Sequence, residues 1–292
     1  MAAADPISRP ISSATLGTRI DHELFVFLGA RRREAEELDD RATILIDEIR
    51  RLIAAGGKRL RPAFCYWGYR ATGAPDDDRI VRAAAALELL HTFALIHDDL
   101  IDGSDERRGV PSSHRELERS AGRGTADASR FGRAAALLAG DLAVVLADEL
   151  LLASGFEADT LLRAQAVYHE MREELAAGQL LGLLATPRDE AEARRLASLK
   201  GGAYSVLWPL TFGATLAAGS ASLLDALSAF GRPLGEAFQL RDDLLDDPAS
   251  SPVGKETVNA LVAEAKAALV GRVLDAEAVR ALDALADHVA LP

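Results

Sequence analysis

From about residue 19 onward, the hydrophobic and polar positions are typical of one helix following another. Ala, Leu, Glu and Arg dominate these stretches, and all four are strong helix formers. No sustained alternation of apolar and polar residues bounded by hairpin turns is present, so no sheet is expected. The pattern predicts helices over residues 20–54, 59–72, 77–102, 126–154, 158–185, 189–218, 221–246, 257–272 and 275–289.

Gly and Pro mark the boundaries between these helices. The boundaries fall at residues 56–57, 73–75, 103–111, 122–124, 155, 187, 219 and 248–252. Residues 1–18 are rich in Ala, Ser and Pro, which predicts a loose N-terminal arm. No linker or repeat divides the remainder, so residues 19–292 are predicted to form one domain. The predicted fold is all-α, a single large helical bundle around a central cavity, with sites built on facing helices.

Two clusters of aspartates end two of the predicted helices with the same pattern, D-D-x-x-D. The first aspartate cluster is Asp98-Asp99-Leu100-Ile101-Asp102, and the second is Asp242-Asp243-Leu244-Leu245-Asp246. In a helix, the first and last carboxylates of each cluster lie one turn apart on the same face, where they repel each other. A solvated helix end is the ordinary explanation of one such cluster, but two copies inside apolar runs argue against it. The clusters predict binding of a hard divalent cation such as Mg²⁺, which takes oxygen ligands and shares them with phosphates.

Basic residues stand at the helix boundaries near these clusters. In Gly56-Gly57-Lys58-Arg59-Leu60-Arg61-Pro62, two glycines let the backbone approach an anion, and Lys58 and Arg61 project from the next helix start. Arg107-Arg108 follows the first cluster, and arginine forks bind phosphate oxygens bidentately. Taken singly, each of these groups has an ordinary surface role as its alternative.

Three further residues are candidates for the same site. Lys200 lies at a predicted helix break, Lys255 follows the second aspartate cluster, and His91 precedes Asp98 by seven residues on roughly the same helix face. A solvated lysine and a packed histidine are the ordinary alternatives. Acidic clusters with basic groups beside both predict a diphosphate held by metal ions on one side and by Lys and Arg on the other. The apolar lining of the acidic helices predicts that the remainder of the substrate is hydrocarbon.

Composition narrows the classes of function. Of 292 residues, 49% are hydrophobic, and the net charge of −12 argues against nucleic-acid binding, which needs a basic face. The single cysteine, Cys65, excludes an intrachain disulfide and lies in an apolar run typical of the core. Charges or Pro interrupt the apolar stretches 134–153 and 202–219, so no integral membrane segment is expected. The start of the chain has no signal-peptide pattern, so a cytoplasmic protein is expected.

Jointly, these motifs resemble the trans-isoprenyl diphosphate synthases, also called polyprenyl synthetases. The resemblance covers about residues 40–250. Within the family, the chain most resembles short-chain bacterial enzymes that make geranylgeranyl diphosphate. Its motifs are Gly56 to Pro62, Leu89-Leu90-His91, the first aspartate cluster, Arg107-Arg108-Gly109-Val110-Pro111, Gly140-Asp141, Gly178-Gln179, Lys200, and Gly235 to Asp246.

The resemblance implies an isoprenoid synthase bundle, usually a homodimer, that condenses isopentenyl diphosphate with an allylic diphosphate. Ionisation of the allylic C–O bond, head-to-tail (1′-4) attack by the isopentenyl double bond and proton loss make up the reaction. The allylic diphosphate would bind three Mg²⁺, and Asp98, Asp99, Asp102 and Asp242, with Asp243 or Asp246, would be the metal carboxylates. Arg107, Lys200 and Gln239 would hold the allylic diphosphate. Lys58, Arg61, His91 and Arg108 would hold isopentenyl diphosphate.

In this family the residues four and five positions before the first cluster limit product length. Here they are Ala94 and Phe93, and one aromatic residue beside a small one resembles the floor of a C20 enzyme, with C15 as the alternative. The expected product is therefore geranylgeranyl diphosphate.

The chain departs from the family pattern in three places. Gly201 follows Lys200 where Thr or Ser is usual, and Gly182 stands where an Asp is usual. After Asp246 the chain is short, 292 − 246 = 46 residues, so a shortened C-terminal region is expected, and Lys255 corresponds to either of two family lysines or to neither. These departures leave two alternatives: a class I terpene cyclase on the same fold, or a non-catalytic prenyl-diphosphate-binding partner subunit.

Overall fold

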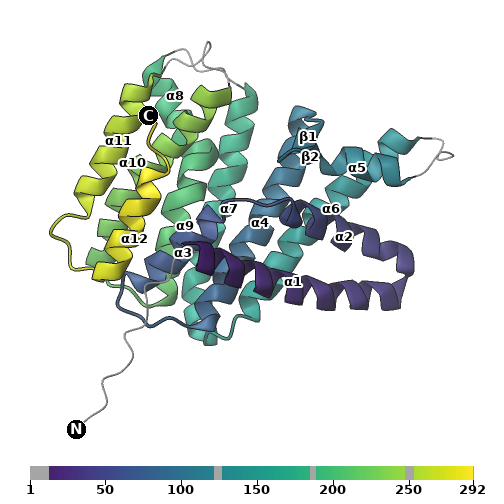
Figure 1. Cartoon of the computed structure of the whole chain (residues 1–292), viewed down its shortest axis with the longest axis horizontal. Helices are drawn as coiled ribbons and strands as arrows, with labels where there is room; N and C mark the ends of the chain where they lie inside the picture. Colours follow the sequence, from purple (N-terminus) through teal and green to yellow (C-terminus); the bar gives the residue numbers. More distant parts are fainter. Residues whose placement is uncertain (1–12, 122–126, 185–188, 247–252, 292) are drawn as a thin grey trace, which may run out of the picture.

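The all-α prediction is confirmed. The computed structural model describes residues 13–121, 127–184, 189–246 and 253–291, which form the helical bundle of Figure 1. The elements are α1 (Ser13–Leu38), η1 (Asp40–Ala42), α2 (Thr43–Ala54), α3 (Leu60–Arg70), α4 (Asp78–Asp102), β1 (Glu106–Arg107), β2 (Val110–Pro111), α5 (Ser113–Ser120), α6 (Ala128–Leu152), α7 (Ala158–Leu184), α8 (Glu190–Ala197), η2 (Ser198–Leu207), α9 (Trp208–Leu216), α10 (Ala221–Asp246), α11 (Lys255–Ala268) and α12 (Ala276–Asp287). The predicted boundaries at residues 122–124, 187 and 248–252 lie outside the described residues.

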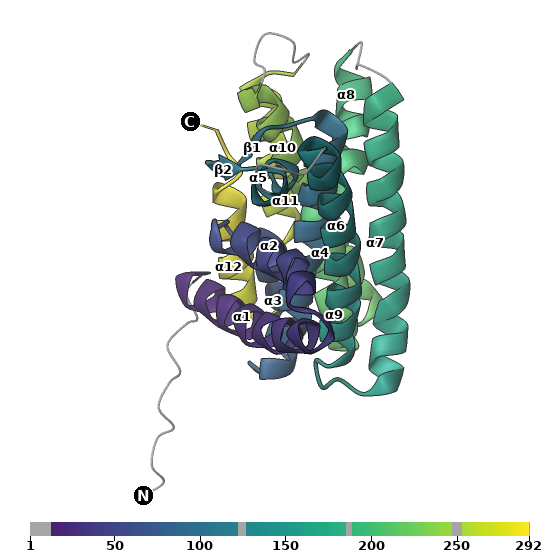
Figure 2. The ribbon, with the colours of Figure 1, turned by 90° about the vertical axis from the view of Figure 1, so that its right-hand side faces the viewer.

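The helices form layers around a shared apolar core. Helix α4 packs against α6 and α3, and η2 packs against α7 and α10. Helix α1 lies across this bundle against α4, and α11 and α12 cover the side formed by α10 and α3 (Figures 1 and 2). Cys65 is fully buried, as predicted for a core residue.

The first helix begins earlier than predicted. Residues 1–12 of the predicted arm lie outside the described residues, but α1 starts at Ser13 rather than at residue 20. Its buried stripe of Leu16, Ile20, Leu24 and Leu28, at a spacing of four, explains the early start, because Leu16 already contributes to the core. The prediction of one helix over 20–54 is also wrong, since Asp39 caps a new turn and α2 begins at Thr43.

Helix α4 carries the first aspartate cluster at its C-terminal end for two local reasons. The Asp77 side chain accepts a hydrogen bond from the backbone N–H of Arg79 (2.8 Å) and starts the helix. Gly103, at φ 66°, adopts the left-handed conformation that stops it directly after Asp102. By length and hydropathy α4 would pass for a membrane span, but 67% of its most apolar window is buried inside the protein. It is therefore the central helix of the core.

The predicted helix over 189–218 is divided into α8, η2 and α9. The middle segment, η2, has the wide turns of a π-helix, a form that is frequent at functional sites. Glycines let it approach its neighbours closely, because a Cβ on Gly202 would lie 2.5 Å from the carbonyl oxygen of Gly235 on α10. This contact holds the Lys200 segment directly against the helix of the second aspartate cluster.

The expectation of no sheet is wrong at one place. Two short strands, β1 and β2, form an antiparallel hairpin directly after α4. Arg108 and Gly109 form its turn, with φ of 56° and 74°, the left-handed pair that a type I′ turn requires. Strands of two residues are too short to show an alternating pattern, so no sequence pattern could indicate them. The short helix α5 after the hairpin was also not predicted.

Candidate functional site

The two aspartate clusters lie at the same end of the bundle, where α4 and α10 both end (Figure 1). Lys200, on η2, interacts electrostatically with both clusters, since its charge opposes the rise in the pKa of Asp102 and of Asp243. Partial burial of these two carboxyl groups raises both pKa values although the residues lie at exposed helix ends, and the neighbouring carboxylates of Asp98 and Asp246, respectively, raise them further. The two clusters therefore share Lys200 as a neighbour, and burial and like charges both oppose ionisation of their carboxyls, which a bound cation would offset.

The three aspartates of the first cluster differ in their environment. Asp99 is fully buried, and its Oδ1 accepts a hydrogen bond from Nε of Arg107 (2.8 Å). Asp98 is half-buried and accepts hydrogen bonds from Nε2 of Gln179 (2.7 Å) and from Arg107 (3.2 Å). Asp102 is exposed at the helix end. Asp98 and Asp102 are thus more accessible to a cation than Asp99, whose carboxylate fixes Arg107.

The aspartates of the second cluster also differ in exposure. Asp242 is half-buried, and burial raises the pKa of its carboxyl. Asp243 is exposed and accepts a hydrogen bond from Nε2 of Gln239 (2.8 Å). Asp246 is exposed at the last described turn of α10. Gln239, Asp243 and Asp246 follow one another at helical spacing, so they present one polar edge of α10.

These carboxylates fit a hard divalent cation. Their oxygens are the ligands that Mg²⁺ takes, and burial, together with neighbouring carboxylates, raises the pKa values of Asp102, Asp242 and Asp243. Among the described residues, no three His, Cys, Asp or Glu side chains already form a metal cage. An ion bound here would complete its coordination with ligands from water or from a substrate, as Mg²⁺ commonly does.

A basic pocket of about 270 Å³ lies beside Asp242, and we call it the basic pocket throughout. It brings together four residues that the sequence singled out: Lys58, Arg61, His91 and Arg108. The complete lining is Gly57, Lys58, Arg59, Leu60, Arg61, Glu88, His91, Arg108, Phe238, Arg241 and Asp242. Five of these residues are Lys or Arg and two are acidic, so the pocket suits a multiply charged anion.

The backbone of two loops shapes the basic pocket. Gly57 has a φ of 154°, and a Cβ there would lie 2.9 Å from Nη2 of Arg108. The absence of a side chain at Gly57 therefore leaves room for the guanidinium of Arg108. Arg61 donates to the hydroxyl of Ser205 (2.7 Å), and its guanidinium stacks 4.6 Å from the ring centre of Tyr204. Burial lowers the pKa of Arg61, which increases its demand for an anionic partner.

His91 contributes a neutral ring to the basic pocket. Burial lowers its pKa well below the usual value, and the charges of Arg61 and Arg108 lower it further. Its Nδ1 is shielded from solvent and has no hydrogen-bond partner among the described residues. The ring therefore offers an unused hydrogen-bonding group to whatever occupies the pocket.

The depressed pKa of His91 makes stability depend on pH. The unfolded chain binds a proton at His91 near pH 6.5, but the folded chain does not, so the folded state loses stability as pH falls below about 6.5. We expect this group to contribute about 1.4 kcal/mol per pH unit over that range. Urea unfolding at pH 7.5 and 5.5 should show that His91→Gln loses about 1.4 kcal/mol less than wild type. An identical loss in both proteins would contradict the assignment, because all other titrating groups are shared.

Lys200 and Gln239 lie beside the two glycines, Gly182 and Gly201, at which the chain departs from the pattern of the family it resembles. An ideal Cβ on Gly182 would lie 3.5 Å from Cδ of Lys200, so the lysine stem packs over this glycine. A Cβ on Gly201 would lie only 2.0 Å from Oε1 of Gln239, so the glutamine carboxamide occupies the space of a side chain at 201. Both glycines therefore make room for a neighbouring site residue.

Two further candidates lie outside the basic pocket. Lys255 is exposed at the first turn of α11 and is not among the described residues that line the pocket. Phe93 is half-buried on α4, with its ring edge-on to His97 at 4.8 Å. It stands on the apolar part of α4 between His91 and Asp98.

Sequence reasoning missed several residues of the site. Arg59, Glu88 and Arg241 line the basic pocket, and Gln179 contacts Asp98. The signal for Gln179 was present in the motif Gly178-Gln179, but nothing in the sequence indicated which residue it would contact.

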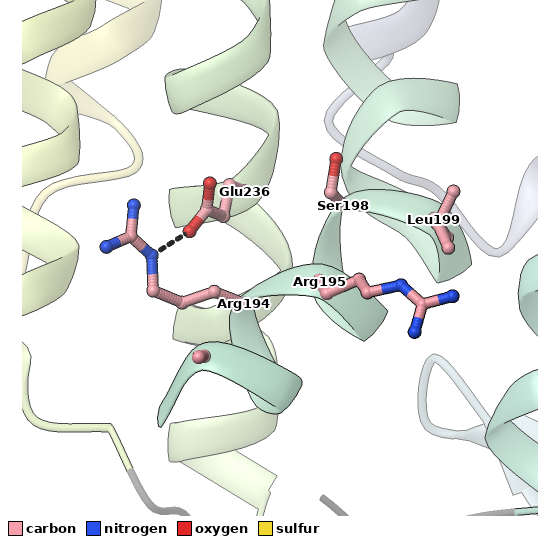
Figure 3. Close-up of a pocket in the computed structure, with 6 residues that line it drawn as sticks. Arg194, Arg195, Ser198, Leu199 and Glu236 are labelled. Atoms are coloured by element: carbon pink, nitrogen blue, oxygen red, sulfur yellow. Dashed lines mark hydrogen bonds and ion pairs between the residues drawn. The ribbon is translucent and has the colours of Figure 1, made fainter. Parts of the chain in front are cut away.

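A second pocket, of about 500 Å³, is formed by α8, η2 and α10 (Figure 3). Its lining includes Arg194 and Arg195 of α8, Ser198 and Leu199 of η2, and Glu236 of α10. Figure 3 shows Arg194 directed to Glu236, with which it forms an ion pair, and Arg195 directed to the opposite side. This ion pair braces α8 against α10 one turn before Gln239, so the pocket supports the site and contains none of the clustered aspartates.

The chain is similar to known proteins in both sequence and fold. The polyprenyl synthetase family matches residues 42–253. A geranylgeranyl diphosphate synthase of Methanosarcina mazei is 34% identical over 206 residues, which are 70% of this chain and 59% of that protein. A short chain isoprenyl diphosphate synthase of Methanothermobacter thermautotrophicus is 31% identical over 255 residues, 82% of this chain and 72% of that protein. The chain thus spans about three fifths of the first relative's length.

Among solved structures, a geranylgeranyl pyrophosphate synthase from Corynebacterium glutamicum, complexed with isoprenyl diphosphate and magnesium, is similar with a TM-score of 0.86. The two chains are 28% identical, and the match covers 95% of this chain and 99% of that one.

Proposed function

The chain belongs to the polyprenyl synthetase family, and we propose that it is a short-chain prenyltransferase that condenses isopentenyl diphosphate with an allylic diphosphate. The observation that carries this proposal is the pairing of two different anion sites at one end of the bundle. One is built from carboxylates with Lys200 near both clusters, and the other is the basic pocket, which reaches Asp242 at its edge. Two diphosphates of different roles need two such sites.

The allylic diphosphate would bind between the two aspartate clusters. Asp98, Asp102 and Asp242, with Asp243 and Asp246, would hold Mg²⁺, and we propose three ions for each active site. Asp99 would contribute to diphosphate binding indirectly, because its buried carboxylate accepts a hydrogen bond from Arg107 and so orients that side chain. Arg107, Lys200 and Gln239 would contact the diphosphate, and Lys255 is a further candidate from the start of α11. Mg²⁺ supplies positive charge to the departing diphosphate when it is bound.

Isopentenyl diphosphate would occupy the basic pocket, held by Lys58, Arg61, His91 and Arg108. The charges of Arg107 and Lys200, already in position, stabilise the negative charge that gathers on the leaving diphosphate without reorganisation. The isopentenyl double bond then attacks the allylic cation, and proton loss completes the step. In this proposal the apolar face of α4 around Phe93 would exclude water, which would otherwise quench the cation.

The basic pocket also separates this proposal from its alternatives. A terpene cyclase on the same fold ionises one diphosphate and has no use for a second anion site. A non-catalytic partner subunit has no use for two complete aspartate clusters. Lys58, Arg61, His91 and Arg108 stand together in the pocket, and this supports the synthase.

One experiment tests the proposal against both alternatives. Pure protein is incubated with Mg²⁺ and farnesyl diphosphate, with and without isopentenyl diphosphate, and the products are analysed. We expect an elongated diphosphate only when both substrates are present. Hydrocarbon from farnesyl diphosphate alone would identify a cyclase, and binding without any product would identify a partner subunit.

We propose geranylgeranyl diphosphate, C20, as the product, with C15 as the alternative, because Phe93 would end the space for the growing chain. Phe93→Ala should therefore give products at least one isoprene unit longer, measured by chromatography of the hydrolysed alcohols. Phe156→Ala is the matched control and should leave the products unchanged. Phe156 lies in the loop after α6, and its ring packs against Tyr69 of α3. No lengthening in Phe93→Ala would exclude Phe93 as the floor.

We further propose that the protein is a cytoplasmic homodimer. Helix α6 exposes Phe131, Leu138, Val145 and Leu152, at intervals of seven residues, with exposed fractions of 38%, 55%, 59% and 66%. A stripe with this spacing is typical of a helix–helix seam, and exposed apolar surface of this extent marks an interface. A second copy is the expected occupant, because a two-fold axis pairs the same surface with itself.

Replacing one residue of this stripe should separate the subunits. Leu138→Asp is expected to convert a dimer into a monomer, because the charge would be buried without a partner. Light scattering during size-exclusion chromatography measures the mass directly. Val273→Asp, at a residue that is 98% exposed between α11 and α12, is the control and should stay dimeric. A dimeric Leu138→Asp would place the interface elsewhere.

A further inference from the structure

Glu88 is an unexpected member of the basic pocket. It lies on α4, three residues before His91, and only 2% of its surface is exposed. A carboxylate in a pocket for a diphosphate repels the ligand, and a buried carboxylate is costly unless it is paired. Its presence among basic residues therefore requires a role other than contact with the anion.

The contacts of Glu88 divide the arginines of the pocket into two kinds. Arg59 donates to Glu88 (Nη1 to Oε1, 2.7 Å), to Asp21 (2.7 Å) and to the carbonyl oxygen of Ile53 (2.9 Å). All three nitrogens of this guanidinium are thereby engaged. Nη2 of Arg108 lies 3.8 Å from the same Oε1, which is close enough for attraction but too far for a hydrogen bond. Arg108 therefore keeps its donors for a ligand, whereas Arg59 does not.

Both arginines belong to strained turns. Arg59 has a φ of 49° and Arg108 a φ of 56°, and non-glycine residues hold this conformation only where the surroundings fix it. Arg59 stands in the loop that carries Lys58 and leads into Arg61, and Arg108 stands in the hairpin turn. Glu88 is the acidic side chain that both of them approach. It thus connects the two loops that supply the cations of the basic pocket.

We propose that Glu88 is a positioning residue for the second diphosphate. It fixes the loop at 56–61 through Arg59 and holds the guanidinium of Arg108 against Gly57, so that Lys58, Arg61 and Arg108 converge on one anion. This inference rests on the proposed function, and it deepens it by naming a residue that acts on the isopentenyl diphosphate site without touching the substrate. The aspartate clusters and the allylic diphosphate are not expected to depend on Glu88.

Steady-state kinetics with each substrate varied in turn test this role. Glu88→Gln keeps the shape but removes the charge, and the KM for isopentenyl diphosphate should rise about 10²-fold, the effect of misplaced binding groups. The KM for farnesyl diphosphate should change less than about twofold. Glu88→Asp keeps the charge but shortens the side chain, so it should raise the KM for isopentenyl diphosphate about tenfold. If Glu88→Gln does not fold, Glu88→Asp still tests the proposal.

The matched control is Glu23→Gln, which breaks an ion pair with Arg82 (3.2 Å) outside the pocket and should change neither KM. If Glu88 only neutralised charge, Glu88→Gln would bind isopentenyl diphosphate more tightly, and Glu88→Asp would resemble wild type. Either result, or an equal rise in both KM values, would overturn the proposal. Calorimetric titration of isopentenyl diphosphate into wild type and Glu88→Gln separates this test from the proposed function. Failure of wild type to elongate rejects the function, whereas equal affinity of the two proteins rejects the role of Glu88.

Discussion

Asp98→Asn is expected to lower kcat for chain elongation about 10³-fold with little change in stability. A metal-binding carboxylate contributes several kcal/mol of charge stabilisation in the transition state. About 4 kcal/mol corresponds to roughly 10³-fold in rate. Asn has the same shape, and its Oδ1 can still accept the hydrogen bond from Gln179. The variant should therefore fold normally and lose the charge that attracts the cation.

The measurement compares kcat at several Mg²⁺ concentrations with the urea unfolding of each protein. Asp78→Asn is the matched control, because Asp78 begins the same helix, is 70% exposed and pairs with Arg19 on the surface. It should retain full activity. If Asp98→Asn kept kcat within about tenfold of wild type, the first cluster would not be the metal site. A large loss of stability would instead assign Asp98 a structural role.

The helical fold was predictable because its signals are local. Strong helix formers, Gly and Pro boundaries and acidic N-caps are all visible in the sequence, and most helix boundaries agree within a few residues. The misses occurred where tertiary packing decides. The early start of α1 depends on Leu16 in the core, and the π-helical turns of η2 depend on glycine contacts with α10. The hairpin depends on two left-handed residues, of which only Gly109 is an obvious candidate.

The site was predictable in its residue types and only partly in its contacts. Spacing along one helix relates His91 to Asp98, because both are on α4. Nothing in the sequence indicated that Asp99 would be fully buried against Arg107 while Asp102 stays exposed. Nor did it indicate that Glu88, within an apolar run, would face arginines from two distant loops. Such pairings join residues that are far apart in sequence and arise only when the helices pack.

Arg107 and Arg108 are adjacent in the hairpin, yet their removal is expected to have different consequences. Arg107→Ala leaves the fully buried Asp99 without its partner, which should cost about 3 kcal/mol of stability and lower kcat. Arg108→Ala removes a donor that lines the basic pocket and makes no hydrogen bond to Glu88, which keeps its bond to Arg59. Its stability should therefore stay near wild type, and the KM for isopentenyl diphosphate should rise about 10²-fold.

Urea unfolding and substrate kinetics on the two variants separate these effects. Arg115→Ala is the control, because Arg115 follows the same hairpin but pairs with Asp105, which is 68% exposed, and should change stability by less than about 1 kcal/mol. The alternation along β1 and its turn explains the contrast: one arginine lies against the aspartates of α4, and the next lies against Gly57 across the pocket. If both arginines affected the same KM, or if Arg108→Ala were the less stable variant, the division of the site between two diphosphates would be wrong. If instead each variant weakened the binding of a different substrate, the result would show that one hairpin supplies a cation to each substrate.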